Sequence, residues 1–431
     1  MTADRGGDPA PGRGWSRREF LRAAAAAGWL GALGAARPGA DGAVRIGLVA
    51  PAAGAFGPEG EAIRRGVRLG AEEASRTAQL FDRRLELAEA AADTPAAAAR
   101  EAARLVRERH ATVLVGGADE AGARALAEAA DRHGVLFLNA GCADDALRGA
   151  ACRRSAFHVA ASAAMYTDAL ADGLVTGAGL ERWYFVTSGS EASAALRRRA
   201  QDALRARGGE ERGAAVLAGA AADPRALLAD VQRSEADVLY TCLAGAEQLR
   251  LLRRYREASP GFQVAGPLLE TIRLWDADPA ARAGTWPTMW YHERKPFGAS
   301  SLSARFQERF GRAMDPLGWA GWLAVKVAWE AALRAGTNEP AGLAAFLEGP
   351  RAEFDGHKGV PLGFRPWDHQ LRQPLYLVRA RTEIPDRWDV FEVVAELPRA
   401  KPGEAASPRE LLDRLGDDRT RSRCSFPRGE P

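Results

Sequence analysis

The residue types that most often carry chemistry lie apart from one another in this 431-residue sequence. Its six histidines never occur four residues apart, so they lack the spacing with which a helix face binds zinc. The patterns Cys-x-x-Cys, G-x-S-x-G and G-x-x-x-x-G-K-[ST] do not occur, and the first glycine-bearing turn lacks G-x-G-x-x-G. The sequence therefore predicts a protein that is not an enzyme and that holds no cofactor or metal.

What remains is a set of turns rich in small residues, each of which follows an apolar run and opens a helical one. They are Gly116-Gly117-Ala118, Asn139-Ala140-Gly141, Ser188-Gly189-Ser190 and Ala244-Gly245. Backbone N–H groups at a helix N-terminus can bind a carboxylate or another polar group. For any single turn, the simpler interpretation is that glycine lets the chain bend. Several such turns together favour a ligand-binding cleft.

The elements that would position these turns alternate between short apolar strands and alanine-rich helices. Expected strands are 44–50, 85–90, 112–117, 135–141, 182–186, 213–219, 236–242 and 262–268, and the first helices are expected near 59–76, 95–109 and 119–132. Such alternation predicts parallel sheets with right-handed crossovers, in which ligands bind at the carboxyl ends of the strands. We expect an α/β fold with two doubly wound, Rossmann-like lobes joined by a hinge.

The alternation ends after Thr285, and the later elements must return to the two lobes. We expect a short strand at 288–293, one or two helices within 301–335, and a pair of strands within 376–394. The expected organisation is 43–158 and 286–350 in the first lobe, 159–285 and 351–397 in the second, and an extended or loosely packed tail at 398–431.

The first forty residues have the pattern of an export signal. Ser-Arg-Arg-Glu-Phe-Leu at 16–21 precedes a weakly hydrophobic, alanine-rich run at 23–36, which is typical of a twin-arginine signal peptide. We assign 1–42 to this signal, with a disordered basic tail as the alternative. The run is too short for a membrane anchor, and no cysteine follows it to carry a lipid.

Charge and cysteine content narrow the function further. The 59 basic residues face 56 acidic ones, so the sequence gives no reason to expect a nucleic-acid partner. Export places four cysteines, Cys142, Cys152, Cys242 and Cys424, in an oxidising compartment. Their spacing leaves all three complete pairings open.

Taken together, these features resemble the type I periplasmic substrate-binding proteins of ABC importers, in their branched-chain amino acid group, over residues 44–396. Four blocks, at 139–154, 299–334, 354–378 and 422–426, are more specifically similar to a subfamily that accompanies pyrroloquinoline quinone (PQQ)-dependent alcohol oxidation. The resemblance implies a Cys152–Cys424 disulfide, with Cys142–Cys152 as the rival pairing.

The resemblance also implies a set of ligand-binding residues. These are Phe56, Gly57, Gly117, Ala118, Asn139, Ala140, Gly141, Gly189, Ser190, Gly245 and Glu270. Glu270 would bind an ammonium group. The chain departs from the family because Ala118 has no hydroxyl and Ala244-Gly245 has no aromatic ring, which argues against an ordinary leucine-type ligand.

In this fold, residues 364–380 form a turn that leads into the closing strands. Pro366 and Pro374 bracket the turn, and Asp368 and Gln370 satisfy its backbone. The less favoured alternative is that Arg365 or Arg372 faces the cleft and clamps an anion.

The implied function is a monomeric, non-catalytic periplasmic protein that captures a small organic solute for an ABC permease in the inner membrane. The solute would be amino-acid-like or derived from a carboxylate or alcohol. The alternative is a sensor or accessory protein of a PQQ-dependent alcohol oxidation system that delivers no cargo.

Overall fold

The computed structural model describes residues 42–219, 223–267, 275, 279–381, 383–384, 386–400 and 403–426. All but the last residue of the expected signal, as well as Glu270, lie outside these ranges. The described residues include no helix that is long and apolar enough to cross a membrane.

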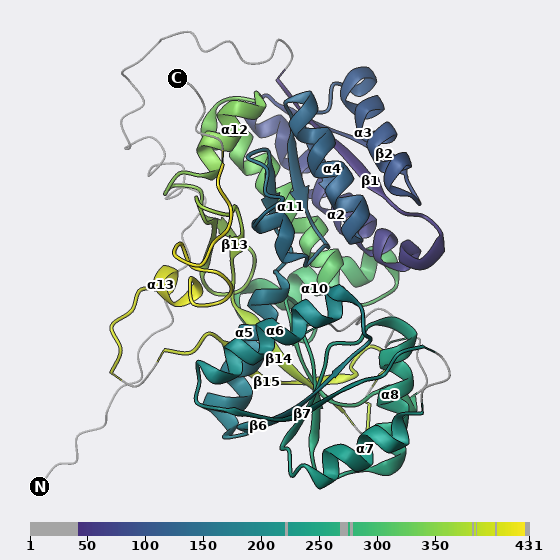
Figure 1. The fold of residues 1–431 in the computed structure, drawn as a ribbon. Helices are drawn as coiled ribbons and strands as arrows, with labels where there is room; N and C mark the ends of the chain where they lie inside the picture. The colour runs from purple at the N-terminus through teal and green to yellow at the C-terminus, as the bar shows by residue number, and fades with distance from the viewer. Residues whose placement is uncertain are drawn as a thin grey trace, which may run out of the picture. The chain divides into compact units, whose positions relative to one another are not determined.

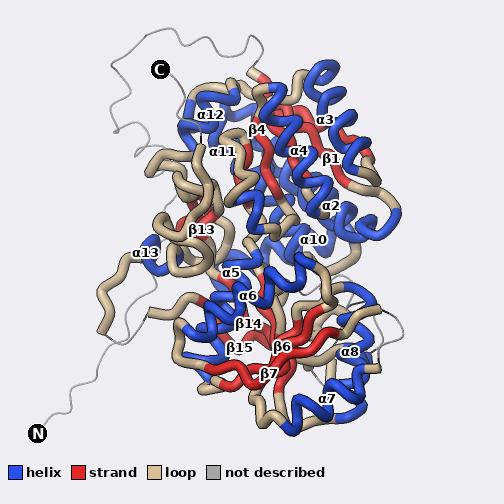
Figure 2. The backbone as a smooth tube through the Cα atoms, viewed as in Figure 1, coloured by secondary structure: helices blue, strands red, loops and turns tan. Residues whose placement is uncertain are grey.

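The first lobe is built on a five-stranded parallel sheet with the order β2-β1-β3-β4-β5 (Figures 1 and 2). Its strands are β1 (Ala43–Ala50), β2 (Arg84–Ala91), β3 (Val113–Gly116), β4 (Leu136–Asn139) and β5 (Ala156–His158). Alternate residues of each strand point to opposite faces. Leu48 and Val115 therefore join the core beneath α2 (Gly57–Ala78), whereas Val49 and Leu114 join the core beneath α3 (Pro95–Arg109) and α4 (Glu120–His133).

The second lobe is built on a seven-stranded sheet with the order β15-β14-β10-β9-β8-β6-β7. Its strands are β6 (Arg182–Thr187), β7 (Glu210–Val216), β8 (Val238–Thr241), β9 (Gln263–Ala265), β10 (Thr285–Thr288), β14 (Leu375–Ala380) and β15 (Phe391–Leu397). Helices α5 (Ala163–Ala171) and α6 (Glu191–Arg205) contribute to the core on one face, and α7 (Pro224–Arg233) and α8 (Gly245–Ala258) to that on the other. The predicted α/β class with two doubly wound lobes is confirmed.

Three further helices follow β10, namely α10 (Ala299–Phe310), α11 (Pro316–Ala335) and α12 (Pro340–Leu347). Asp315 caps the start of α11 by accepting a hydrogen bond from the Gly318 N–H at 2.8 Å, and Pro316 follows it as the first helical residue. Helix α11 packs along α2, so this late part of the chain returns to the first lobe.

The late strands differ from their expected positions in two ways. Strand β10 covers Thr285–Thr288 rather than 288–293, and it includes Pro287, whose missing N–H makes a central strand hard to predict. Residues expected to close the second lobe instead form a separate small sheet of β11 (Phe354–Asp355), β12 (Pro361–Phe364) and β13 (Leu371–Arg372). A bridge between His158 and Gln370 joins this small sheet to β5.

The C-terminal tail is not loosely packed over its described part. Residues 408–412 form helix α13, whose Ser407 and Glu410 make a capping box. Leu412 and Leu415 are buried, and a disulfide joins Cys424 to Cys152 with a Cα–Cα distance of 5.6 Å. The other two cysteines, Cys142 and Cys242, are buried free thiols. The tail is ordered by contacts to distant residues, and its own Pro- and Arg-rich composition does not reveal them.

Candidate functional site

The carboxyl ends of β3 and β4 bring two of the predicted turns into contact. Gly116 pairs with Asn139 in the parallel register, and the Ala140 N–H donates to the Gly116 carbonyl at 2.9 Å. Gly117 has a φ of +89°, and a Cβ there would lie 2.6 Å from the Asn139 Oδ1. Only glycine fits at this position without strain. The conformation of this turn therefore depends on glycine at position 117.

Asn139 shapes this turn and has no spare hydrogen-bonding group for a ligand. Its Nδ2 donates to the Cys142 carbonyl at 2.8 Å and lies 3.2 Å from the His158 Nδ1. Its Oδ1 accepts from the N–H groups of Gly141 and Cys142. Asn139 is fully buried, and so is Ala140. We therefore revise the expected ligand-binding role of Asn139 and Ala140 to a structural one.

His158 supports Asn139 as a neutral ring. Because an amide Nδ2 can only donate, the His158 Nδ1 that faces it must accept, which places the ring proton on Nε2. Burial, followed by the charges of Arg148 and His369, lowers the pKa of His158 well below its usual range. Hydrogen bonding and burial thus favour the same uncharged form.

The first turn is held by a residue that the sequence reasoning missed. Asp93, just after β2, accepts hydrogen bonds from the N–H groups of Ala52 and Ala53 at 2.8 Å each. These two bonds, that of Ala53 first, lower the pKa of Asp93. Phe56 is 43% exposed, whereas Gly57 is buried. The sequence signal for this role was a carboxylate directly after β2, because the carboxyl ends of neighbouring parallel strands meet at one edge of the sheet.

In the second lobe, the predicted turns lie at the carboxyl ends of the paired strands β6 and β8. Gly189 and Ser190 are exposed, and the Ser190 Oγ accepts from the Ser193 N–H at 3.2 Å, which caps α6. Gly245 opens α8, and its exposed N-cap residue Ala244 supplies no side-chain cap. Backbone donors at this helix N-terminus suit a negatively charged or polar group.

The two arginines considered for an anion clamp do not serve that purpose. Arg365, which is 1% exposed, donates to the carbonyl oxygens of Leu412 and Leu415 in the tail. Arg372 donates to the Asp413 Oδ1 at 2.7 Å. Both guanidinium groups are engaged by protein oxygens, so the alternative that either binds a cleft ligand is wrong.

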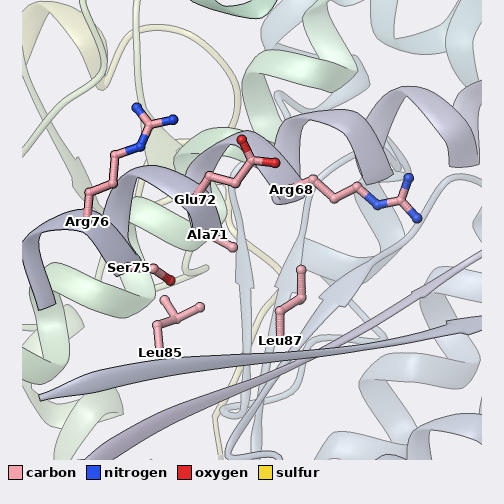
Figure 3. Close-up of a pocket in the computed structure, with 7 residues that line it drawn as sticks. All are labelled: Arg68, Ala71, Glu72, Ser75, Arg76, Leu85 and Leu87. Carbon is pink, nitrogen blue, oxygen red and sulfur yellow. The ribbon is translucent and has the colours of Figure 1, made fainter. Parts of the chain in front are cut away.

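A shallow groove lies between α2 and β2, away from the predicted turns (Figure 3). Leu85 and Leu87 point from the strand toward Ala71 and Ser75 of the helix, and Arg68, Glu72 and Arg76 complete the lining. The two leucines pair with Val44 and Ile46 at the amino end of β1, whereas the turns follow carboxyl ends. Arg68 is engaged by both carboxylate oxygens of Glu89 at 2.8 Å. The groove therefore does not include any predicted site residue.

Metal binding has no support in the described part of the chain, where no three His, Cys, Asp or Glu side chains gather closely enough to hold an ion. The geometry that remains is two sets of turns at the carboxyl ends of parallel strands, one set in each of the two large sheets. That is the arrangement in which α/β proteins bind small molecules.

A family model described as periplasmic binding protein matches residues 43–383. The chain belongs to the periplasmic binding protein family. No curated protein sequence matches it.

Solved structures of periplasmic binding proteins share the fold at low sequence identity. A branched chain amino acid ABC transporter periplasmic ligand-binding protein from Burkholderia xenovorans is 17% identical, with a TM-score of 0.80, and covers 89% of this chain and 99% of its own. A leucine binding protein from Thermotoga maritima is 16% identical, with a TM-score of 0.67, and covers 82% and 98%. A solute binding protein of an ABC transporter from R. palustris, in complex with benzoate, is 18% identical, with a TM-score of 0.68, and covers 89% and 100%.

A hydrogen-bond network surrounds residues 158–160, where the chain passes from the first lobe to the second, and we call these residues the crossing. The sequence did not reveal this network. Arg148 donates to the Gln370 Oε1 at 2.7 Å and to the Ala160 carbonyl at 2.8 Å. The Gln370 side chain donates to the carbonyls of His158 and Ala160, and the Gln373 side chain donates to that of Val159. Three successive carbonyls of the crossing are thereby fixed by side chains.

Proposed function

We propose that this protein is an exported, non-catalytic binding protein that captures a small organic solute between its lobes and presents it to an ABC permease. The observation that carries the proposal is the placement of glycine-bearing turns at the carboxyl ends of parallel strands in both large sheets, in a chain of the periplasmic binding protein family. The proposed location is the periplasm, reached through the twin-arginine signal without a lipid anchor, and the proposed state is a monomer.

The proposed ligand is an amino-acid-like, carboxylate- or alcohol-derived solute. The helix N-terminus after Ala244 offers backbone donors to a carboxylate. Ala118 offers no hydroxyl, and Ala244-Gly245 offers no ring, which weighs against a leucine-type ligand. Related structures bind benzoate and 3,4-dihydroxy benzoic acid, so aromatic carboxylates belong among the candidates. Of the expected residues, we retain Phe56, Gly57, Gly117, Ala118, Gly141, Gly189, Ser190 and Gly245, and Glu270 remains a proposal.

A second candidate function rests on the four-block resemblance to the subfamily that accompanies PQQ-dependent alcohol oxidation. In that role the protein would sense a solute or assist the oxidation system without delivering cargo. Its binding cleft would be the same, so the two functions differ in their partners.

A thermal-shift screen of the mature chain, refolded to remove carried ligand, tests the proposal. The panel comprises amino acids, aliphatic and aromatic carboxylates, alcohols and PQQ. Because binding to the native state alone stabilises it by RT ln(1 + [L]/Kd), a ligand at 100 times its Kd should add about 2.7 kcal/mol. We expect one chemical class to raise the melting temperature. No response to any class would contradict the proposed capture of these solutes.

A pair of matched variants tests the location of the site. Ala244→Trp places a large ring over the start of α8, where the native side chain is exposed. Ala258→Trp places the same ring at the exposed opposite end of the helix. We expect Ala244→Trp to abolish the ligand-induced shift without lowering the melting temperature of the free protein, and Ala258→Trp to preserve the shift. An unchanged shift in Ala244→Trp would place the ligand elsewhere.

A further inference from the structure

Residues 412–426, which begin at the last residue of α13, contact both lobes. Figure 1 shows α13 beside β13, at the level where the chain passes between the lobe that contains β1 and the lobe that contains β6. We call residues 412–426 the interlobe strap.

The strap is attached through Arg365, which directly follows β12, to the small sheet that the His158–Gln370 bridge joins to the first lobe. Its Nε lies 3.1 Å from the Asp413 Oδ1, and its terminal nitrogens donate to the carbonyls of Leu412, Leu415 and Asp417. The Trp367 Nε1 also donates to the Asp417 carbonyl. Because Arg365 is almost completely buried, these charge-assisted bonds are shielded from solvent and hold the strap firmly.

The same short stretch is attached to the second lobe. The Arg199 guanidinium of α6 lies 2.5 Å from the Asp417 Oδ1 and 2.6 Å from the Asp168 Oδ2 of α5. The Gly416 N–H donates to that Asp168 oxygen at 2.9 Å. Asp417 thus binds the second lobe through its side chain and, through its carbonyl, residues that follow β12 of the small sheet.

The far end of the strap is fixed to the first lobe by two contacts. Cys424 is bonded to Cys152, which precedes β5, and the Phe426 ring stacks on His369 with 4.2 Å between ring centres. A disulfide this far along the chain prevents the strap from leaving as a free tail. The strap is therefore anchored at three places: near Leu412, at Asp417 and at Cys424.

We propose that the interlobe strap limits the relative motion of the two lobes, with the Asp417–Arg199 pair as the contact that must yield when they move. Any movement of α6 away from the small sheet separates Arg199 from Arg365, and Asp417 is bound to both. The inference goes beyond the proposed solute capture, because lobe motion is measurable with no ligand present.

Two adjacent acids in the strap provide a matched test. Asp417→Ala removes the contact with Arg199 but leaves the Arg199–Asp168 pair in place. Asp418→Ala removes only bonds within the strap, because Asp418 accepts from Thr420 and Arg421. Hydrogen exchange then reports on the Gly416 N–H and on the crossing, where the N–H groups of Val159 and Ala160 donate to the Asn139 carbonyl.

In Asp417→Ala we expect the N–H groups of Gly416, Val159 and Ala160 to exchange at least about tenfold faster than in the wild type, and small-angle scattering to give a larger radius of gyration. Asp418→Ala should match the wild type at Val159 and Ala160. The double variant Cys152→Ser/Cys424→Ser keeps Asp417–Arg199 but frees the far end, and it should also accelerate exchange at the crossing. Faster exchange confined to α6, or equal effects of the two aspartate variants at the crossing, would overturn the proposal.

Discussion

At the scale of single residues, Lys358 is a lysine whose amino group is buried. Its Nζ donates to the Gln373 Oε1 at 2.7 Å and to the Pro374 carbonyl at 3.0 Å, and it lies 4.0 Å from the centre of the Trp319 ring. The two oxygens are neutral acceptors. Burial lowers the pKa of Lys358 well below its usual range, with Glu396 acting against this shift and Arg294 adding to it.

This lowered pKa predicts that stability rises with pH. An unfolded lysine has a pKa of about 10.4, so between the folded pKa and that value the unfolded chain binds more protons than the native one. The free energy of unfolding then increases with pH by up to about 1.4 kcal/mol per pH unit. Lys358→Met removes the titration, so we expect the wild type to gain stability relative to Lys358→Met in urea unfolding between pH 7 and pH 10.

Lys326→Met is the control for this measurement. Lys326 lies partly exposed on α11 and pairs with Glu330 one turn away. Its difference from the wild type measures what the loss of one partly exposed positive charge does to stability over the same pH range. A difference between Lys358→Met and the wild type that does not change with pH would contradict the predicted titration of Lys358.

The residue scale is also where sequence reasoning was least informative about the site. The sequence places Asn139 and Arg365 near strand ends, but a polar side chain there is equally able to face a ligand or the backbone. Asn139 folds back onto its own turn, and Arg365 binds carbonyls some fifty residues further along the chain. Such choices depend on which distant segments arrive beside the residue, and a single sequence carries no local signal for that.

At the scale of elements, the contact between α2 and α11 depends on close approach of the two backbones. A Cβ on Gly66 would lie 1.9 Å from the Gly318 carbonyl oxygen, and one on Gly321 would lie 2.5 Å from that of Ile63. Glycines in helix interiors are normally unfavourable by up to about 1 kcal/mol relative to alanine. Here they let two helices pack more closely than side chains would allow.

Gly66→Ala therefore should destabilise the protein despite its better helix propensity. The added methyl overlaps a backbone oxygen, so the helices must separate, and overpacking of this kind costs about 1–3 kcal/mol. We expect a lower free energy of unfolding in urea by about 2 kcal/mol. The control is Gly261→Ala, because nothing lies within 4 Å of a Cβ there. Equal stability of the two variants would contradict close helix packing.

The elements show what the sequence can and cannot predict. The alternation of apolar strands and alanine-rich helices sufficed for the parallel sheets, since their periodicity is local. The small sheet was missed because β11 and β13 are two residues long, which is too short for a pattern. Strand β10 was misplaced because Pro287 hides it. Its antiparallel pairing with β14 comes from a strand some ninety residues later.

At the scale of the whole molecule, the core connects the lobes. One cluster of buried side chains contains Leu48 and Val115 from the first sheet together with Trp183 and Tyr240 from the second. Where the chain returns to the first lobe, Trp290 stacks on Trp319 of α11 with 5.9 Å between ring centres. The Cys152–Cys424 disulfide adds a covalent link between the interlobe strap and the first lobe. The two lobes therefore share buried apolar contacts, and the loss of these contacts would expose apolar side chains of both lobes to water.

This continuity predicts that the lobes unfold together. If each lobe had its own core, calorimetry would show two transitions, as is common for proteins of this length. Because Trp183 and Leu48 belong to one cluster, unfolding of either lobe removes partners from the other, and we expect a single transition whose van't Hoff and calorimetric enthalpies agree. Trp290→Ala removes the stack on Trp319 and should lower the transition temperature of the whole molecule. Two resolved transitions in the wild type would show instead that the shared cluster does not couple the lobes, and motion between them would then be restrained mainly by the strap.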